Sequence, residues 1–205
     1  MTPEHIVVHH SITPRDQDPN RAEQGINRTH KERFNFKSAR GWYVGYQYII
    51  YGNWELRQYR KDTEAGAHTA EQSMNFKSIG VCLTGNFDIE LPTRAQTNTL
   101  TKFLKDKSKQ YKIKSIRPHR YYATYKSCYG NKLGNDWASN LTKGNMNPNV
   151  VIYKNGAEYH VAHKATTAQG LAQLLVASGC YDLIGPDGDP DFAEIDKITH
   201  VLWIS

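Results

Sequence analysis

Two histidines and one cysteine in this 205-residue chain have the types and positions of a metal-ligand set. His9 ends an apolar run that predicts a buried strand, and His119 follows a second short strand. Cys128 comes after eight intervening residues, in a loop. Two imidazoles and one thiolate suit Zn²⁺, and three protein ligands leave a fourth position for water, as in catalytic sites. Spacing alone does not separate such a site from ordinary buried histidines, and His10 is an alternative to His9.

Strands that alternate with helices are expected to position these residues. Apolar and aromatic runs predict strands over residues 5–10, 44–51, 54–59, 78–84 and 113–116. Apolar residues at helical spacing predict one helix over residues 20–36 and another that follows Pro92, with Thr93 as its N-cap. Residues 120–134 are polar and rich in tyrosine, which indicates a loop. This alternation of strands and helices predicts an α/β domain.

Composition is that of a globular protein and leaves two classes of polymeric partner open. Hydrophobic residues make up 39% of the chain, enough for a core, and no apolar run is long enough to span a bilayer. Three cysteines are too few, and odd in number, for a disulfide framework; Cys82 lies in a predicted buried strand as a small core residue. The net charge of +6 favours an anionic polymer as partner, either nucleic acid or cell wall.

Five sequence blocks in one fixed order extend the evidence beyond spacing. They are HIVVHHS at 5–11, GWYVGYQYII at 41–50, GAH at 66–68, NFKSIGVCLTGNFD at 75–88, and PHR with YKSC at 118–128. Together they closely resemble the type 2 N-acetylmuramoyl-L-alanine amidase family, which includes amidase-type phage lysozymes and peptidoglycan-recognition proteins. The resemblance covers about residues 5–140. It implies a mixed central β-sheet flanked by helices and one Zn²⁺ per chain, bound by His9, His119 and Cys128.

The resemblance also assigns roles to four further residues. Tyr46 and Lys126 match residues that assist catalysis in the phage enzymes, and Lys126 is the expected cation beside the oxyanion. His68 and Asn75 match positions beside the substrate cleft. One departure concerns the ligand loop, which reads Cys128-Tyr129-Gly130 where family members often have Cys-Pro-Gly. The spacing from His119 is also about one residue longer than in many relatives, so the shape of this loop is not carried over.

The implied reaction is zinc-dependent hydrolysis of the amide bond between N-acetylmuramic acid and L-alanine in peptidoglycan. Anionic cell-wall polymers are a second expected partner, whereas no nucleic-acid motif supports nucleic-acid binding. The start of the chain lacks the pattern of a secretory signal. We therefore expect a phage endolysin, made in the host cytoplasm and acting on the wall after release. The alternative is a non-catalytic peptidoglycan-binding or phage regulatory protein on the same fold; Cys128 favours the enzyme, because non-catalytic recognition proteins usually lack that ligand.

Composition and charge change near residues 143–148, which predicts a boundary between an amidase domain at 1–146 and an extension at 147–205. The first part holds 23 basic and 13 acidic residues, a charge of +10, and the second holds 3 and 7, a charge of −4. The expected elements of the small α+β extension are a hairpin over 150–161, a helix over 166–178 and a strand over 201–204. Because the extension is too short to bury much core alone, we expect it to dock on the amidase domain, self-associate or bind the wall.

Overall fold

The computed structural model describes residues 1–142, 150–154, 157–160 and 201–203. The chain divides into two compact units, Met1–Thr142 and Lys143–Ser205. The predicted domain boundary at residue 146 lies outside the described residues. Within the described part of the chain, no helix has both the length and the apolar character needed to cross a membrane.

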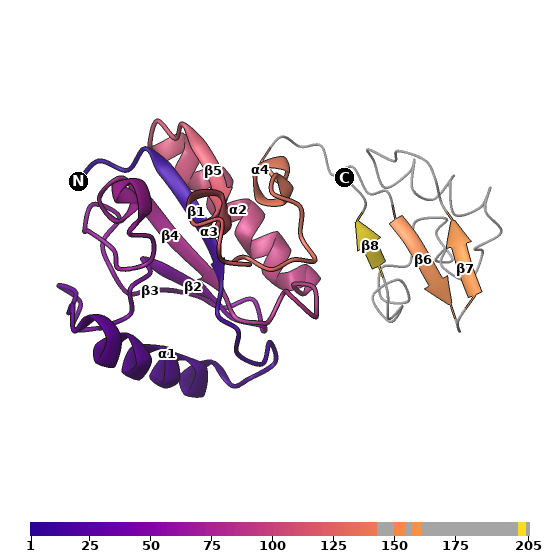
Figure 1. Ribbon diagram of the computed structural model, residues 1–205, viewed down its shortest axis with the longest axis horizontal. Coiled ribbons are helices and arrows are strands. Elements are labelled where there is room, and N and C mark those ends of the chain that lie inside the picture. The colour runs from indigo at the N-terminus through magenta and orange to yellow at the C-terminus, as the bar shows by residue number, and fades with distance from the viewer. Residues whose placement is uncertain (143–149, 155–156, 161–200, 204–205) are drawn as a thin grey trace. The chain divides into compact units, whose positions relative to one another are not determined.

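The first unit is built on a mixed sheet of five strands in the order β3-β2-β4-β1-β5 (Figure 1). The strands are β1 (His5–His10), β2 (Tyr48–Ile50), β3 (Leu56–Gln58), β4 (Ser78–Leu83) and β5 (Ser115–Pro118). Strand β1 pairs in parallel with β4 and β5, and β2 pairs in parallel with β4. Only β3 at one edge runs antiparallel to its neighbour β2. The predicted mixed central sheet is confirmed.

Two long helices cover opposite faces of this sheet (Figure 1). Helix α1 (Pro19–Phe34) begins after Asp18, whose carboxylate accepts a hydrogen bond from the Arg21 amide. Helix α2 (Arg94–Gln110) begins at the predicted cap, where Thr93 and Gln96 form a reciprocal capping box. Three shorter helical elements complete the unit: η1 (Glu71–Phe76), α3 (His119–Tyr122) and α4 (Trp137–Asn140).

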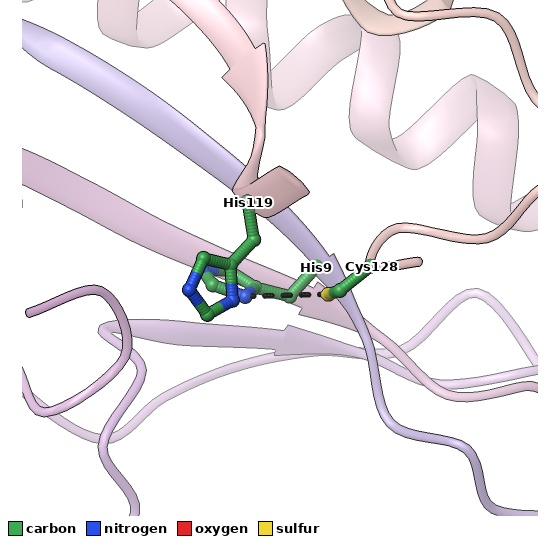
Figure 2. A group of neighbouring side chains, drawn as sticks. All are labelled: His9, His119 and Cys128. Atoms are coloured by element: carbon green, nitrogen blue, oxygen red, sulfur yellow. Dashed lines mark hydrogen bonds between the residues drawn. The ribbon is translucent and has the colours of Figure 1, made fainter. Parts of the chain in front are cut away.

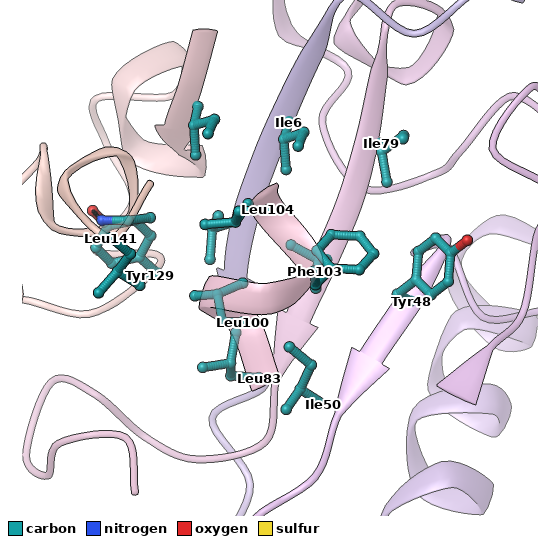
Figure 3. Packing of buried hydrophobic residues seen from close by; sticks show 14 of the residues in the cluster. Ile6, Tyr48, Ile50, Ile79, Leu83, Leu100, Phe103, Leu104, Tyr129 and Leu141 are labelled. Carbon is teal, nitrogen blue, oxygen red and sulfur yellow. Dashed lines mark hydrogen bonds between the residues drawn. The ribbon is translucent and has the colours of Figure 1, made fainter. Parts of the chain in front are cut away.

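Alternation along the strands distributes side chains between the two helices. Leu100, Phe103 and Leu104 of α2 pack on one face of the sheet (Figure 3). Their partners on the strands include Ile6, Val8, Ile50, Ile79, Val81 and Leu83. The face toward α1 has a smaller apolar cluster, made of Ala22, Ile26, Val44, Ile49, Tyr51, Tyr59 and Cys82. Each fully buried aliphatic side chain contributes about 1.5 to 3 kcal/mol to folding.

The predicted strands over 44–51 and 54–59 are longer than the strands observed. Before Tyr48 the backbone of Gln47 still bonds to Gly80 and Tyr59, and side chains add to these bonds: the Gln47 amide oxygen accepts from the Gly80 amide at 2.7 Å, and the Arg60 guanidinium donates to the Val44 carbonyl at 2.7 Å. Trp54 has a φ of 72° and is exposed, so the turn extends past it and β3 begins at Leu56. Short α3 overlaps the start of the segment over 120–134 that was predicted to be a loop.

The second unit contains a three-stranded antiparallel sheet in the order β7-β6-β8. Its strands are β6 (Val150–Lys154), β7 (Ala157–His160) and β8 (Val201–Trp203). Strands β6 and β7 pair as the predicted hairpin, and β8 lies at the position of the predicted closing strand. The predicted helix over 166–178 lies outside the described residues.

Candidate metal centre and active site

His9, His119 and Cys128 converge at one end of the central strands (Figure 2). Their candidate ligand atoms all lie within 4.8 Å of one another. His9 comes from β1, His119 from the first residue of α3, and Cys128 from the loop that follows. Nδ1 of His9 lies 3.5 Å from Sγ of Cys128. One ring nitrogen of His119 points toward this pair and the other points away (Figure 2).

The donor types, and the separation between His9 and Cys128, fit a tetrahedral zinc ion. Zn–N distances of about 2.0 to 2.1 Å and a Zn–S distance of about 2.3 Å place N and S donors about 3.6 Å apart. The observed separation of 3.5 Å between His9 Nδ1 and Cys128 Sγ agrees with that value. The three donors leave room in the coordination sphere for water or substrate, which is the pattern of catalytic zinc.

Burial prepares the two histidines to act as neutral ligands. His9 and His119 are 1% and 5% exposed. Burial lowers the pKa of both rings, and the neighbouring Lys126 cation lowers the pKa of His119 further. Burial raises the pKa of the Cys128 thiol to about 12. A metal that binds here therefore displaces a proton from sulfur and finds both imidazoles already deprotonated.

Strand alternation separates His9 from the alternative ligand His10. His10 points to the α2 face, where its Nδ1 accepts a hydrogen bond from the Phe87 amide at 3.0 Å. Its ring lies against Phe87, with a centroid separation of 5.9 Å. His10 reaches the site only through its backbone, whose N–H donates to Cys128 Sγ at 3.4 Å. The structure brings His9, and not His10, to the three-residue group.

Hydrogen bonds hold the Cys128 loop on both sides of the thiol. The amide of Arg120 donates to the Cys128 carbonyl at 2.6 Å, and the Arg120 guanidinium donates to the Gly130 carbonyl at 2.6 Å. Asp88 accepts from the Ser127 hydroxyl at 2.8 Å and from the Asn131 amide at 2.9 Å. Sequence analysis singled out neither Arg120 nor Asp88, because both act on backbone at a distance along the chain.

Tyr46 and Lys126 lie next to the candidate ligands, as the resemblance implied. The Tyr46 ring lies 5.0 Å from the His9 ring, measured between centroids. Burial raises the pKa of Tyr46 well above its usual value, so the phenol remains a hydrogen-bond donor. Lys126 is exposed and its Nζ lies 3.5 Å from Nε2 of His119. The Tyr46 ring and the Lys126 ammonium thus each lie beside a candidate ligand histidine; their catalytic roles stay predictions.

His68 and Asn75 lie behind His9 and form one local unit. Nδ1 of His68 is 3.1 Å from Nε2 of His9, and the His68 side chain is largely buried. A Cβ at Gly80 would lie 2.5 Å from Cδ2 of His68, so glycine lets this ring pack on β4. Oδ1 of Asn75 accepts from the amides of His68 and Thr69, each at 2.8 Å. These contacts position the loop, and the substrate-binding role predicted for the two residues stays a prediction.

A family profile identifies the protein family to which this chain belongs. The profile of the N-acetylmuramoyl-L-alanine amidases matches residues 1–131, which is more than half of the chain. The chain belongs to the type 2 N-acetylmuramoyl-L-alanine amidase family. The matched range contains all seven residues predicted for the amidase site and ends before the second unit.

Individual relatives agree with the family. The chain is 28% identical over 103 residues to peptidoglycan-recognition protein 2 of Holotrichia diomphalia, a match that covers 49% of this chain and 51% of the relative. The chain thus spans about half the length of that curated relative. The N-acetylmuramoyl-L-alanine amidase LysC from Clostridium intestinale is similar with a TM-score of 0.53 and 26% identity, over 63% of this chain and 78% of LysC.

A phage protein shares the same fold. The Ph2119 endolysin from the Thermus scotoductus MAT2119 bacteriophage Ph2119 has a TM-score of 0.54 and 21% identity. That likeness covers 69% of this chain and 86% of the endolysin. The fold of the amidase domain is therefore the one predicted from the sequence blocks.

Two further residues next to the candidate site, Glu71 and His30, were also not predicted from the sequence. Glu71 begins η1; its Oε2 lies 3.4 Å from Nε2 of His119 and its Oε1 accepts from the Tyr125 hydroxyl at 2.6 Å. Burial alone would raise the pKa of Glu71, but these hydrogen bonds hold it at about 2. His30 of α1 accepts from the Gly45 amide at 2.8 Å and packs on the Tyr46 ring. No local motif marks either residue, since each acts on a segment distant in sequence.

Proposed function

We propose that this protein hydrolyses the amide bond between N-acetylmuramic acid and L-alanine in peptidoglycan, with one Zn²⁺ bound by His9, His119 and Cys128. The convergence of these three donors within 4.8 Å of one another, with His9 and Cys128 at 3.5 Å, carries the proposal. Membership of the amidase family supports the reaction, and the likeness to LysC supports an active enzyme. Bound zinc in such a site supplies a Lewis acid that activates water and polarises a carbonyl.

The remaining chemistry falls to side chains around the three donors. Lys126, exposed and 3.5 Å from the His119 ring, brings a positive charge to the oxygen that becomes negative when the lactyl carbonyl is attacked. The Tyr46 hydroxyl, kept protonated by burial, donates a hydrogen bond to the same oxygen or to the attacking water. His68 holds the His9 ring through its Nδ1 contact.

We further propose that the protein works as a phage endolysin, made in the host cytoplasm and acting on the wall after release. The likeness of the GYQYII and SIGVCLTG blocks and of Lys126 to the phage lysozymes supports this assignment. Residues 147–205, with a charge of −4, would add wall contact, self-association or docking to the basic amidase part rather than chemistry.

Mass spectrometry of purified sacculi after digestion tests the reaction. We expect stem peptides released with a free N-terminal L-alanine, and intact glycan strands. Cys128→Ser should release none, whereas Lys112→Ala, a change to an exposed lysine just after α2, should leave the products unchanged. Binding to sacculi without release of peptides by the zinc-loaded protein would replace the enzyme with the peptidoglycan-binding alternative.

A further inference from the structure

Glu71 connects two segments of the candidate site that are distant in sequence. It lies three residues after His68, at the start of η1, on the segment that positions His9. Its carboxylate contacts the opposite segment twice, at the His119 ring and at the Tyr125 hydroxyl. The Glu71 side chain is 23% exposed and that of His119 only 7%, so their contact is partly shielded from water.

A neutral histidine that binds a metal through one ring nitrogen needs a hydrogen-bond acceptor beside its other ring nitrogen. A neutral imidazole carries one N–H and one lone pair. If the His119 nitrogen that points to His9 and Cys128 gives its lone pair to the metal, the nitrogen that points away must carry the proton (Figure 2). That proton needs an acceptor in a buried site. Among the described residues, the side-chain contacts of His119 Nε2 are Glu71 Oε2 at 3.4 Å and Lys126 Nζ at 3.5 Å.

Only one of these two groups can accept the proton. The ammonium of Lys126 has donors and no acceptor, so it cannot satisfy an N–H group. The Glu71 carboxylate accepts, and its other oxygen is already fixed by Tyr125. With Nε2–H of His119 donating a hydrogen bond to Glu71, the charge of Lys126 remains available for the substrate. The Glu71 carboxylate therefore orients the His119 ring, and the Lys126 ammonium is not needed as a partner of His119 Nε2.

We propose that Glu71 is a positioning residue that accepts a hydrogen bond from Nε2–H of His119 and so directs the other ring nitrogen to the metal. This inference rests on the proposed zinc function. Carboxylates behind metal-bound histidines fix the ring tautomer and raise the basicity of the ligand. Glu71 does so from outside the five sequence blocks, and Tyr125 holds it in place.

Zinc affinity, measured by competition with a chromogenic chelator on metal-free full-length protein, tests this role. We expect Glu71→Ala to weaken zinc binding about 10- to 100-fold, the usual effect of losing such a partner. Glu71→Gln keeps an acceptor oxygen without the charge, so its affinity should fall between those of wild type and Glu71→Ala. Tyr125→Phe should weaken binding less than Glu71→Ala, because the carboxylate still faces His119. The visible absorption of Co²⁺-loaded protein should change in the same order.

Glu4→Gln is the matched control. The Glu4 carboxylate accepts a hydrogen bond from Lys114 at 2.7 Å and is not part of the candidate metal site. This variant should bind zinc like wild type. Thermal unfolding of the metal-free variants separates positioning from folding: the midpoint of Glu71→Ala should stay near that of wild type. Equal zinc affinity in wild type and Glu71→Ala would overturn the inference alone. A fall in affinity matched by a fall in the metal-free midpoint would also overturn it, and failure of wild type to bind zinc would overturn the proposed function as well.

Discussion

The two faces of the central sheet differ in what they bury. The face under α2 is closed mainly by aliphatic and aromatic side chains, including fully buried Leu100 and Leu104, with His10 and Gln96 as buried polar exceptions. The face under α1 buries polar groups beside its smaller apolar cluster. Gln47 and Arg60 are both 0% exposed, His9 is 1% exposed and His68 is 8% exposed. On that face the Gln47 amide donates to the Glu64 carbonyl and the Arg60 guanidinium donates to the Val44 carbonyl, whereas Nε2 of His68 is buried without a hydrogen-bond partner among the described residues. Packing on the α2 face mainly stabilises the fold, whereas the buried polar groups on the α1 face mainly position the residues of the candidate site.

Strand β1 shows the difference within six residues. Ile6 and Val8 turn toward the α2 core, and the alternate position His9 turns toward the site. Substitutions on the two faces should therefore have separable effects, one on the reaction and one on the free energy of unfolding.

The largest effect is expected for His9→Ala on the α1 face. Loss of one of three protein ligands removes zinc, so turnover should fall to the background of a sacculus-clearing assay and metal content from one ion per chain toward zero. Elemental analysis after reloading measures this. His5→Ala, at the other end of β1 with a 2.8 Å contact to Ser115, should keep one zinc. A His9→Ala protein that still holds one zinc would return the ligand role to another histidine.

Lys126→Ala should lower turnover about 100- to 1000-fold while zinc content stays at one per chain. The reason is that Lys126 acts on charge that develops during the reaction and donates no ligand atom. Turnover on sacculi and elemental analysis of the same sample give both numbers. If Lys126→Ala and the surface control Lys112→Ala turn over alike, Lys126 is an ordinary solvated charge.

On the α2 face, Leu100→Ala should lower the free energy of unfolding by about 3 kcal/mol, because it leaves a cavity between α2 and the sheet. Turnover per folded molecule should not change. Urea denaturation of the metal-free protein measures the loss. Leu56→Ala, at a position 40% exposed, should change stability by less than about 0.5 kcal/mol. A strong loss of turnover in folded Leu100→Ala would break the division between the two faces.

The smallest effect is expected at the start of α2. Thr93→Ala removes the side-chain oxygen that accepts from the Gln96 amide at 3.0 Å, and should cost about 1 kcal/mol of unfolding free energy. Thr93→Ser keeps a hydroxyl at the cap and should recover most of the loss in the same urea titration. Equal stability of the alanine and serine variants would show that the capping box contributes little here.

Patterns local in sequence predicted the strands, both long helices and the Thr93 cap, because these depend on neighbouring residues. The choice between His9 and His10 was not available from the pattern, since β1 is buried on both faces and its apolar run shows no alternation. The contacts of Glu71, Arg120 and Asp88 were also out of reach. Glu71 and His119 are 48 residues apart, and only the folded sheet brings their segments together.

Arg120 and Asp88 fix the backbone around Cys128 through contacts that use no metal-binding atom. The fold itself therefore carries the thiol to the two imidazoles. Small zinc domains differ, because their chains stay unfolded until the ion arrives. Under the proposed zinc function, folding and metal loading are therefore separate steps, and the metal-free protein should keep its fold.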